Sequence, residues 1–464
     1  MKSLGNEKKW FNSPARILLF ALTLVPLIFL IVSVIRCHVD VPFWDQWNFV
    51  PLLGKSFERG SSFEDLRALH NEHRLFFPRL IMLALAHLSG YNISCELACS
   101  ILLAAGMFFL VLGRVKKIFS LLGSPGFPWV GPILSLVAFS LHQGENWVWG
   151  WQIQIFLNVL AVVAGLMILT SPEFNWRNFF GGAACGVVAT YSYANGLAYW
   201  LLGFLALLLI SYSSRRRKLT ALAMWLALTV IVFVSYFYRF ESASPSGEPL
   251  FYFAMHPWEY FQYILKYLGA TIITYQEYAL FFGILCLILF GLTVRVFLRK
   301  YRNAFAAMLP FLLLGLYSVA CAVLTGIGRV GFGTAQATSY RYVTFSNLIW
   351  FSNFIFLAIQ FREIRVGSKS KIGARVKMTA LWVILFITLF LVGRTSYRVG
   401  YRVLKSYHQR LVPARSELLR GENDELLGRL YIDTDYVREG IKILQKHKLS
   451  VFRNIIPSGQ KKQQ

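Results

Sequence analysis

The sequence predicts an all-α polytopic membrane protein with about 11 transmembrane helices. Of the 464 residues, 56% are hydrophobic and only 15% are charged, which is more apolar than a soluble chain of this length. Apolar runs near the length that crosses a bilayer recur along the whole chain. Most Lys and Arg residues fall in short clusters between these runs, as they do in cytoplasmic loops.

The net charge of +25 therefore indicates a membrane environment. Basic clusters beside apolar runs attract anionic membrane lipids, and they suit a phosphorylated substrate. The chain has no basic amphipathic module and no RNA-binding fingerprint, which argues against nucleic acid as a partner.

The first predicted span, Ile17–Ile35, leads into an outer loop over residues 36–90. Residues 1–16 are basic, so the positive-inside rule places them in the cytoplasm and the loop outside. The apolar stretch Leu75–Leu88 is about 14 residues long, which is too short to cross a bilayer. We expect it to lie in the membrane interface, with a second interfacial helix at Asp65–Leu69.

The remaining spans alternate in direction, and an odd total leaves the end of the chain outside. They are Cys95–Gly113, Val130–Leu141, Ile155–Leu169, Phe179–Thr190, Trp200–Ile210, Leu219–Tyr238, Ala279–Val294, Ala304–Leu324, Val343–Ile359 and Met378–Val392. Phe261–Tyr275 is expected to be interfacial or re-entrant. We predict a transmembrane domain over 1–393 and a small helical tail over 394–464, helical from Asp424 to Leu449.

Two acids come early in the outer loop, Asp40 and Asp45. An unpaired carboxylate beside lipid is costly, so it indicates either function or an ionic partner. A carboxylate flanked by Trp44 and Trp47 suits a general base that deprotonates a hydroxyl. Asp45 is the preferred candidate, and Asp40 fits an Arg-paired structural acid at least as well.

The same loop carries the polar run His70-Asn71-Glu72-His73-Arg74. The two histidines are three apart, roughly one turn of a helix, so a divalent metal is one reading of the pattern. Phosphate binding through His73 and Arg74 is the preferred reading, because guanidinium geometry matches phosphate. His70 and Glu72 are candidate substrate-binding residues, and a structural role stays open.

Two further outer segments have the composition of a sugar site. The loop His142–Gln154 offers Glu145, Asn146, Trp149 and Gln152, since sugars stack on indole faces and bond to amides and acids. An ordinary interfacial aromatic belt is the alternative. The polar break at Tyr193 and Asn195 lies between two spans, and irregular backbone at membrane depth is expected only where it lines a cavity.

The last outer segment is the glycine-rich stretch GIGRVGFGTAQATSYRY, which runs from Gly326 to Tyr342. Its glycines permit close backbone approach to a ligand, and Arg329 and Arg341 supply cations for a lipid phosphate. Tyr340 is a candidate substrate contact. The stretch lacks the GK[ST] of a nucleotide-binding loop and a preceding strand.

With one span before a loop that reads DVPFWDQW and then HNEHRLFFPRL, the chain resembles the GT-C class of integral membrane glycosyltransferases. That class includes the lipid A aminoarabinose transferases and the protein O-mannosyltransferases. The resemblance implies a polyprenyl-phosphate sugar donor on the periplasmic face of a bacterial inner membrane, in cell-envelope or lipopolysaccharide chemistry. Class members often show an acidic pair where this chain has Asp45-Gln46, so the base and the metal stay open.

The hypothesis is an inverting transfer to a glycan, lipid or protein hydroxyl, with Asp45 as base and Arg74 and Arg341 on the leaving phosphate. A transporter or flippase of lipid-linked sugars is one alternative, although it requires ionisable groups within the spans, which are almost free of charge. An O-antigen polymerase or ligase is another, with the same donor class.

Overall fold

The structure is a computed structural model that describes residues 14–123, 130–240, 254–301, 304–367 and 386–453, with 379 and 383. Part of the predicted span Met378–Val392 (378, 380–382, 384 and 385), the middle of the outer loop Arg239–Tyr260, and the end of the chain lie outside the described residues. Within this described part the chain is almost wholly helical, as the sequence predicts. Its only strand pair is β1 (Leu69–His70) with β2 (His73–Arg74).

Among the described residues, seven helices are long and apolar enough to cross a membrane. They are α2 (Pro14–Cys37), α6 (Ile93–Leu121), α9 (Ile153–Leu169, reached through the turn from Gly150), α12 (Arg215–Phe237), α15 (Gln276–Lys300), α16 (Phe305–Arg329) and α17 (Val343–Gly367). Three shorter helices occupy the other predicted spans that the structure describes: α7 (Val130–Ala138), α10 (Trp176–Thr190) and α11 (Leu197–Leu209). The polytopic all-α class is therefore confirmed.

The surface of the bundle is apolar on helices that face outward. Val230, Ile231 and Val234 on α12 are each at least 60% exposed, and Leu292 on α15 is 56% exposed. A water-soluble surface does not carry continuous stripes of this kind, whereas membrane lipid covers them at no cost.

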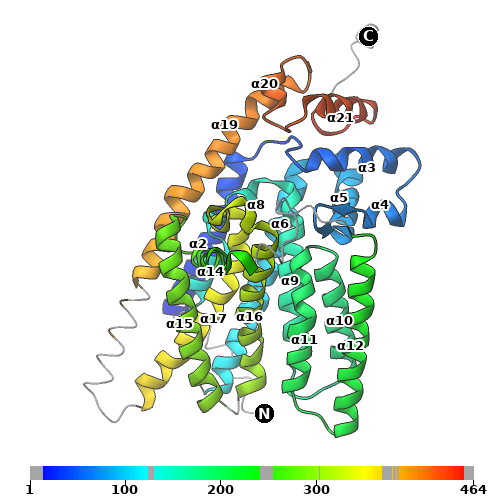
Figure 1. The fold of residues 1–464 in the computed structure, drawn as a ribbon. Helices are drawn as coiled ribbons and strands as arrows, with labels where there is room; N and C mark the ends of the chain where they lie inside the picture. Colours follow the sequence, from blue (N-terminus) through cyan, green and yellow to red (C-terminus); the bar gives the residue numbers. More distant parts are fainter. Residues whose placement is uncertain are drawn as a thin grey trace.

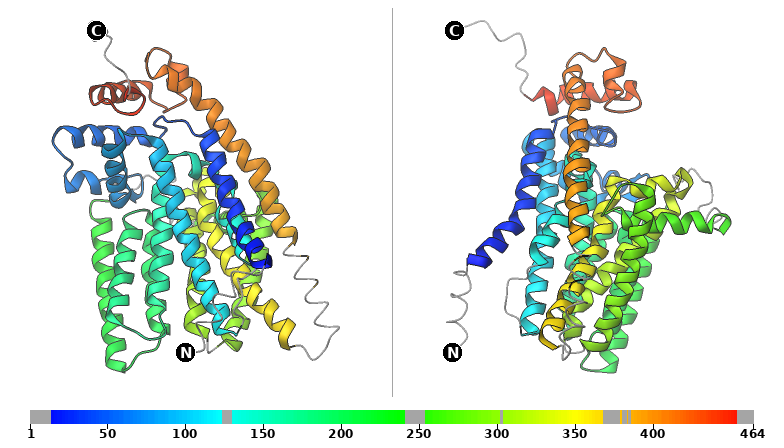
Figure 2. Two further views of the ribbon diagram at one scale, coloured as in Figure 1. Left: turned by 180° about the vertical axis from the view of Figure 1, so that it is seen from behind. Right: turned by 90° about the vertical axis from the view of Figure 1, so that its left-hand side faces the viewer.

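Helix α17 forms the centre of the bundle, and its side chains from Val343 to Ile359 are buried. Two of its polar side chains donate to backbone carbonyls of neighbouring helices: Trp350 Nε1 donates to the Leu268 carbonyl (2.9 Å), and Asn353 donates to the Cys286 carbonyl (3.1 Å). These bonds fix α17 against α14 (Pro257–Gly269) and α15. α14 lies across the bundle and covers most of the segment predicted to be interfacial or re-entrant (Figure 2).

The outer loop folds into short elements at one end of the bundle (Figure 1). They are α3 (Gln46–Glu58), α4 (Phe63–Arg67), the β1–β2 hairpin and α5 (Phe76–Ser89). α5 and α4 correspond to the two predicted interfacial helices. The reading of His70 and His73 as one helical turn is wrong, because they are partners across the hairpin and Asn71 turns the chain with a φ of +51°.

Short helical turns replace the other loops at this end. They are η1 (Leu141–Gln143), α8 (Glu145–Val148), η2 (Gly150–Gln152), η3 (Ala194–Gly196), η5 (Val330–Phe332), η6 (Thr334–Thr338) and η7 (Tyr340–Tyr342). The predicted glycine-rich loop starts later than expected, because α16 continues as a helix to Arg329.

The chain then returns through a π-helical turn, η8 (Ser396–Gly400), into the long α19 (Tyr401–Glu417), which runs beside α2 (Figure 2). α20 (Asp424–Leu427), α21 (Thr434–Lys446) and η9 (Ser450–Phe452) follow. The helical pattern predicted from Asp424 to Leu449 is thus split in two. α21 packs on α3, so the tail and the outer loop cover the same end of the bundle (Figure 1).

Candidate active site

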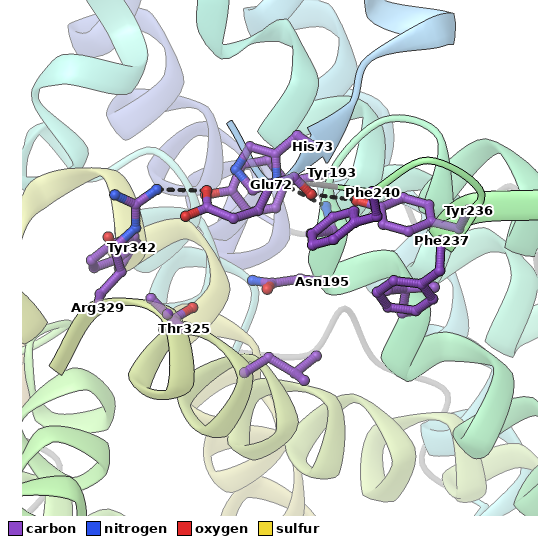
Figure 3. A pocket seen from close by; sticks show the side chains of 14 residues that line it. Glu72, His73, Tyr193, Asn195, Tyr236, Phe237, Phe240, Thr325, Arg329 and Tyr342 are labelled. Carbon is purple, nitrogen blue, oxygen red and sulfur yellow. Dashed lines mark hydrogen bonds and ion pairs between the residues drawn. The ribbon is translucent and has the colours of Figure 1, made fainter. Parts of the chain in front are cut away.

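A cavity of about 160 Å³ lies at this end, between the β1–β2 hairpin, the end of α12 and the end of α16. Figure 3 shows the side chains that line it. Five of the predicted site residues are among them: Glu72, His73, Tyr193, Asn195 and Arg329. The lining also includes residues that sequence reasoning missed: Tyr236, Phe237, Phe240, Leu324, Thr325 and Tyr342.

The cavity contains an ion pair formed across distant parts of the chain. Arg329, at the end of α16, donates to the Glu72 carboxylate from the hairpin turn, with 2.7 Å between Nη2 and Oε2. Both side chains keep some exposure, 26% for Arg329 and 18% for Glu72. A phosphate or a sugar hydroxyl that enters the cavity therefore meets one cation and one carboxylate on the same wall.

His73 forms another wall of the cavity. Its ring stacks on Tyr193 with 4.0 Å between centroids, and its Nδ1 accepts the Ala194 N–H at 3.3 Å. Burial is the main cause that lowers the pKa of His73 to about 3, and the charges of Arg329 and Arg341 add to it. His73 is therefore a neutral hydrogen-bonding group at physiological pH.

Four predicted site residues form a second group beside the cavity, here called the rim cluster: Asp45, His70, Glu145 and Arg341. Asp45 Oδ2 lies 3.4 Å from His70 Nε2, and Glu145 Oε2 lies 3.7 Å from Arg341 Nε. Arg341 interacts electrostatically with both Glu145 and Asp45. The rim cluster and the cavity are neighbours. His70 of the cluster pairs across the hairpin with His73 of the cavity, and Arg341 of the cluster directly precedes Tyr342, which lines the cavity.

Three side chains of the rim cluster are partly exposed to solvent, whereas His70 is 11% exposed. The exposed fractions of the side chains are 25% for Asp45, 24% for Glu145 and 42% for Arg341. Asp45 precedes the first residue of α3 and its carboxylate does not cap that helix. A carboxylate that is accessible, next to an imidazole and close to a cation has the arrangement of an acid–base group facing an anionic ligand.

Asp40 lies in a different setting. Its Oδ1 accepts the Ile93 N–H at 2.9 Å, and its Oδ2 pairs with Arg453 of the tail. The carboxylate thus anchors the start of α6 and Arg453, the last described residue of the tail. This is the Arg-paired alternative named above for this residue.

Each of the three guanidinium nitrogens of Arg74 donates to a backbone carbonyl. Arg74 is 5% exposed, and it donates to the backbone carbonyls of Tyr236 (2.6 Å), Arg67 (3.1 Å) and Tyr238. These bonds tie the hairpin to the end of α12. The side chain fixes a cavity wall and is not among the residues that line the cavity.

In the loop His142–Gln154, which was expected to bind sugar, most of the candidate side chains are buried and hold neighbouring backbone in place. Asn146 is fully buried and donates to Thr344 Oγ1 (2.8 Å) and to the Arg341 carbonyl (3.2 Å). Trp149 is 5% exposed, and its Nε1 donates to the Phe43 carbonyl at 2.9 Å. Tyr340 packs edge-on against His142, with centroids 5.7 Å apart. Asn146 holds the backbone of Arg341, and Trp149 holds the residues before Asp45.

Among the residues that the structure describes, no group of three or more His, Cys, Asp or Glu side chains is placed to hold a metal ion. His70 and His73 are paired across the hairpin, but each ring contacts a different side chain, Asp45 for His70 and Tyr193 for His73.

No protein-family model matches this chain, and no curated protein matches it. Among solved structures, the chain is similar to ArnT from Cupriavidus metallidurans, which was crystallised bound to undecaprenyl phosphate. The TM-score is 0.46 and the sequence identity is 13%, over 94% of this chain and 89% of that chain.

Proposed function

We propose that this protein is a membrane glycosyltransferase that moves a sugar from a polyprenyl-phosphate donor to a hydroxyl of a glycan, lipid or protein. The observation that supports it most is the rim cluster. In this cluster the partly exposed carboxylate of Asp45 interacts electrostatically with the cation Arg341. The cluster lies beside a cavity at the end of a membrane-spanning bundle.

In the proposed reaction, Asp45 takes the proton from the acceptor hydroxyl. The acceptor oxygen forms a bond to the anomeric carbon while the bond from that carbon to the phosphate oxygen breaks, so the configuration inverts. His70, 3.4 Å from the Asp45 carboxylate, orients the base. Of the two early acids, Asp45 is the better candidate because Asp40 is engaged by Arg453 and the Ile93 N–H.

The leaving polyprenyl phosphate carries its negative charge away without a general acid. Arg341 is suited to stabilise that charge, since it is 42% exposed and its contact with Glu145 is long, at 3.7 Å. Arg329 offers a second cation inside the cavity, although Glu72 already holds it. Tyr193, Tyr342 and Asn195 provide the aromatic and amide surface that a sugar needs.

The site is proposed to face the periplasm of a bacterial inner membrane. Phe237 lines the cavity at one end of α12, and the basic residues Arg215–Lys218 begin that helix at the other end. A helix of this length spans roughly 35 Å, which is enough to cross a bilayer. The positive-inside rule assigns the basic end to the cytoplasm, so the cavity falls on the opposite face.

The test uses the full chain in proteoliposomes loaded with radiolabelled polyprenyl-phosphate sugars and an extract of envelope glycans, lipids and proteins as acceptors. The proposal expects label to leave the prenyl lipid and to appear in a new product. Label that stays on the prenyl lipid and crosses to the other leaflet would overturn the proposal in favour of a flippase.

A further inference from the structure

The turn that carries Asp45 has an unusual backbone. Trp44, the residue before it, adopts a φ of +48°, which bulky side chains avoid unless the surroundings hold them there. The backbone conformation of the turn from Phe43 to Gln46 is therefore not the one that its own residues favour. Contacts from other parts of the chain must maintain it.

One set of contacts comes from the membrane side. Gln46 is fully buried; its Oε1 accepts the Phe43 N–H at 3.2 Å and its Nε2 donates to Glu96 of α6 at 2.6 Å. Trp149 Nε1 donates to the Phe43 carbonyl at 2.9 Å. Gly150 leaves room for this arrangement, since a Cβ there would lie 2.0 Å from Glu96 Oε2.

The second set comes from the carboxyl-terminal tail. The Trp44 N–H donates to the Leu430 carbonyl at 2.8 Å, so the strained residue itself is bonded to the tail. Tyr431 Oη donates to Asn48 Oδ1 at 3.2 Å, one turn further along α3. The tail therefore binds the chain on both sides of Asp45.

The tail is seated closely enough to hold these bonds. Gly440 of α21 packs against the indole of Trp47, where an added Cβ would lie 2.8 Å from the ring. Ile443 packs in the same way against Gly54 of α3. Beyond α21, Arg453 pairs with Asp40, and the Ser450 N–H donates to the Gly90 carbonyl at 2.9 Å.

From these contacts we infer that residues 424–453 are a positioning segment of the active site, which fixes the Phe43–Gln46 turn so that the Asp45 carboxylate faces His70 and the rest of the rim cluster. The inference rests on the proposed function, because it assigns the tail a role in placing the proposed base. A misplacement of a reacting group by about 1 Å costs on the order of 100-fold in rate.

The test compares the full-length Gly440→Leu variant with wild type in proteoliposomes. The added side chain meets Trp47 and pushes α21 away from α3. The matched control is Lys442→Leu, which places the same leucine side chain at a position of the same helix that is 69% exposed. Amide hydrogen exchange over residues 43–47 measures how firmly the turn is held. The kcat measures whether the Asp45 carboxylate is correctly placed as the base. The Kd for a radiolabelled polyprenyl-phosphate sugar measures donor binding.

We expect Gly440→Leu to lose amide protection at residues 43–47 and to lower kcat about 10- to 100-fold, with the donor Kd within about twofold of wild type. Lys442→Leu keeps all three values. Unchanged protection in Gly440→Leu, or lost protection with an unchanged kcat, overturns the inference. If Gly440→Leu does not fold, Arg453→Gln makes the same test with a smaller perturbation.

The proposed function is tested separately by Asp45→Asn in the same preparation. An Asp45→Asn variant as active as wild type rejects Asp45 as the base, whatever the tail does. An inactive Asp45→Asn variant together with a fully active Gly440→Leu variant that has lost protection rejects the positioning role alone.

Discussion

Arg329 donates a 2.7 Å hydrogen bond to Glu72, although 257 residues separate them in the sequence. The bond joins the end of a membrane helix to the tip of the outer hairpin. It closes one wall of the cavity, and it leaves Arg341 of the rim cluster as the cation with the looser contact.

We predict that Arg329 and Glu72 are energetically coupled. Arg329→Ala leaves a partly buried carboxylate without its partner, and Glu72→Gln weakens the same bond, so the double variant should lose less stability than the sum of the two. The expected coupling is about 1 kcal/mol. Denaturant unfolding of the four proteins in detergent measures it, and strictly additive losses would contradict it.

We predict that Arg341 contributes to donor binding. Arg341→Ala should raise the KM for the polyprenyl-phosphate sugar about tenfold or more, because a charged hydrogen bond to phosphate is lost. Arg341→Lys should have a smaller effect, since it keeps the charge but not the bidentate geometry. Arg402→Ala, an exposed position on α19, is the matched control. Equal KM values in Arg341→Ala and Arg402→Ala would speak against the assignment.

We predict an acid-sensitive anchor in the outer loop at Asp65. The hydrogen bond from Lys55, together with the Ser62 cap of α4, lowers the pKa of Asp65 from 3.8 to about 2. The folded state therefore favours the charged carboxylate, so the stabilisation is present above about pH 4 and is lost as the pH falls through 2.

The measurement is the difference in unfolding free energy between wild type and Asp65→Ala across that range. At pH 7 we expect a difference of about 1 kcal/mol, typical of a lost helix cap. Glu64→Ala, which changes an exposed neighbouring acid, serves as the control. A difference that stays constant from pH 7 to pH 2 would refute this anchor.

We predict that His73 makes the folded state less stable as the pH is lowered, over a higher pH range than the one in which Asp65 acts. Its pKa is about 3 in the folded state against 6.5 in the unfolded chain. Between these values the unfolded chain binds a proton that the folded chain does not, so stability is lost as the pH falls below 6.5. The slope attributable to His73 is at most about 1.4 kcal/mol per pH unit.

His73→Gln removes the titrating group while it keeps a hydrogen-bond acceptor near the Ala194 N–H. Urea unfolding of both proteins at pH 7 and pH 5 should show a smaller pH effect in the variant. The same pH effect in both proteins would mean that His73 is not the source.

The spans could be predicted because hydropathy and basic clusters are local properties of the sequence. α2, α6 and α12 fall on the expected runs, and α5 is the expected short helix. Asp45 of the rim cluster was also identifiable, because an acid that follows a span is rare unless it is paired or functional.

The partners of these side chains could not be predicted, because they come from distant parts of the chain. Asp40 meets Arg453 across 413 residues, and no local pattern indicates that pair. Trp149 has the composition of a sugar platform, yet tertiary packing buries it against Phe43. The spacing of His70 and His73 fits a helix, but Asn71 tolerates a positive φ and a hairpin forms instead.

The central claim is that Asp45 is the base of a sugar transfer, and one comparison tests it most directly. Wild type, Asp45→Asn and Glu64→Gln, which removes an exposed carboxylate of the same loop, are assayed together for transfer of radiolabelled sugar in proteoliposomes. We expect Asp45→Asn to lose at least about 100-fold in kcat with donor binding intact, and Glu64→Gln to match wild type. Full transfer activity in Asp45→Asn would contradict the claim.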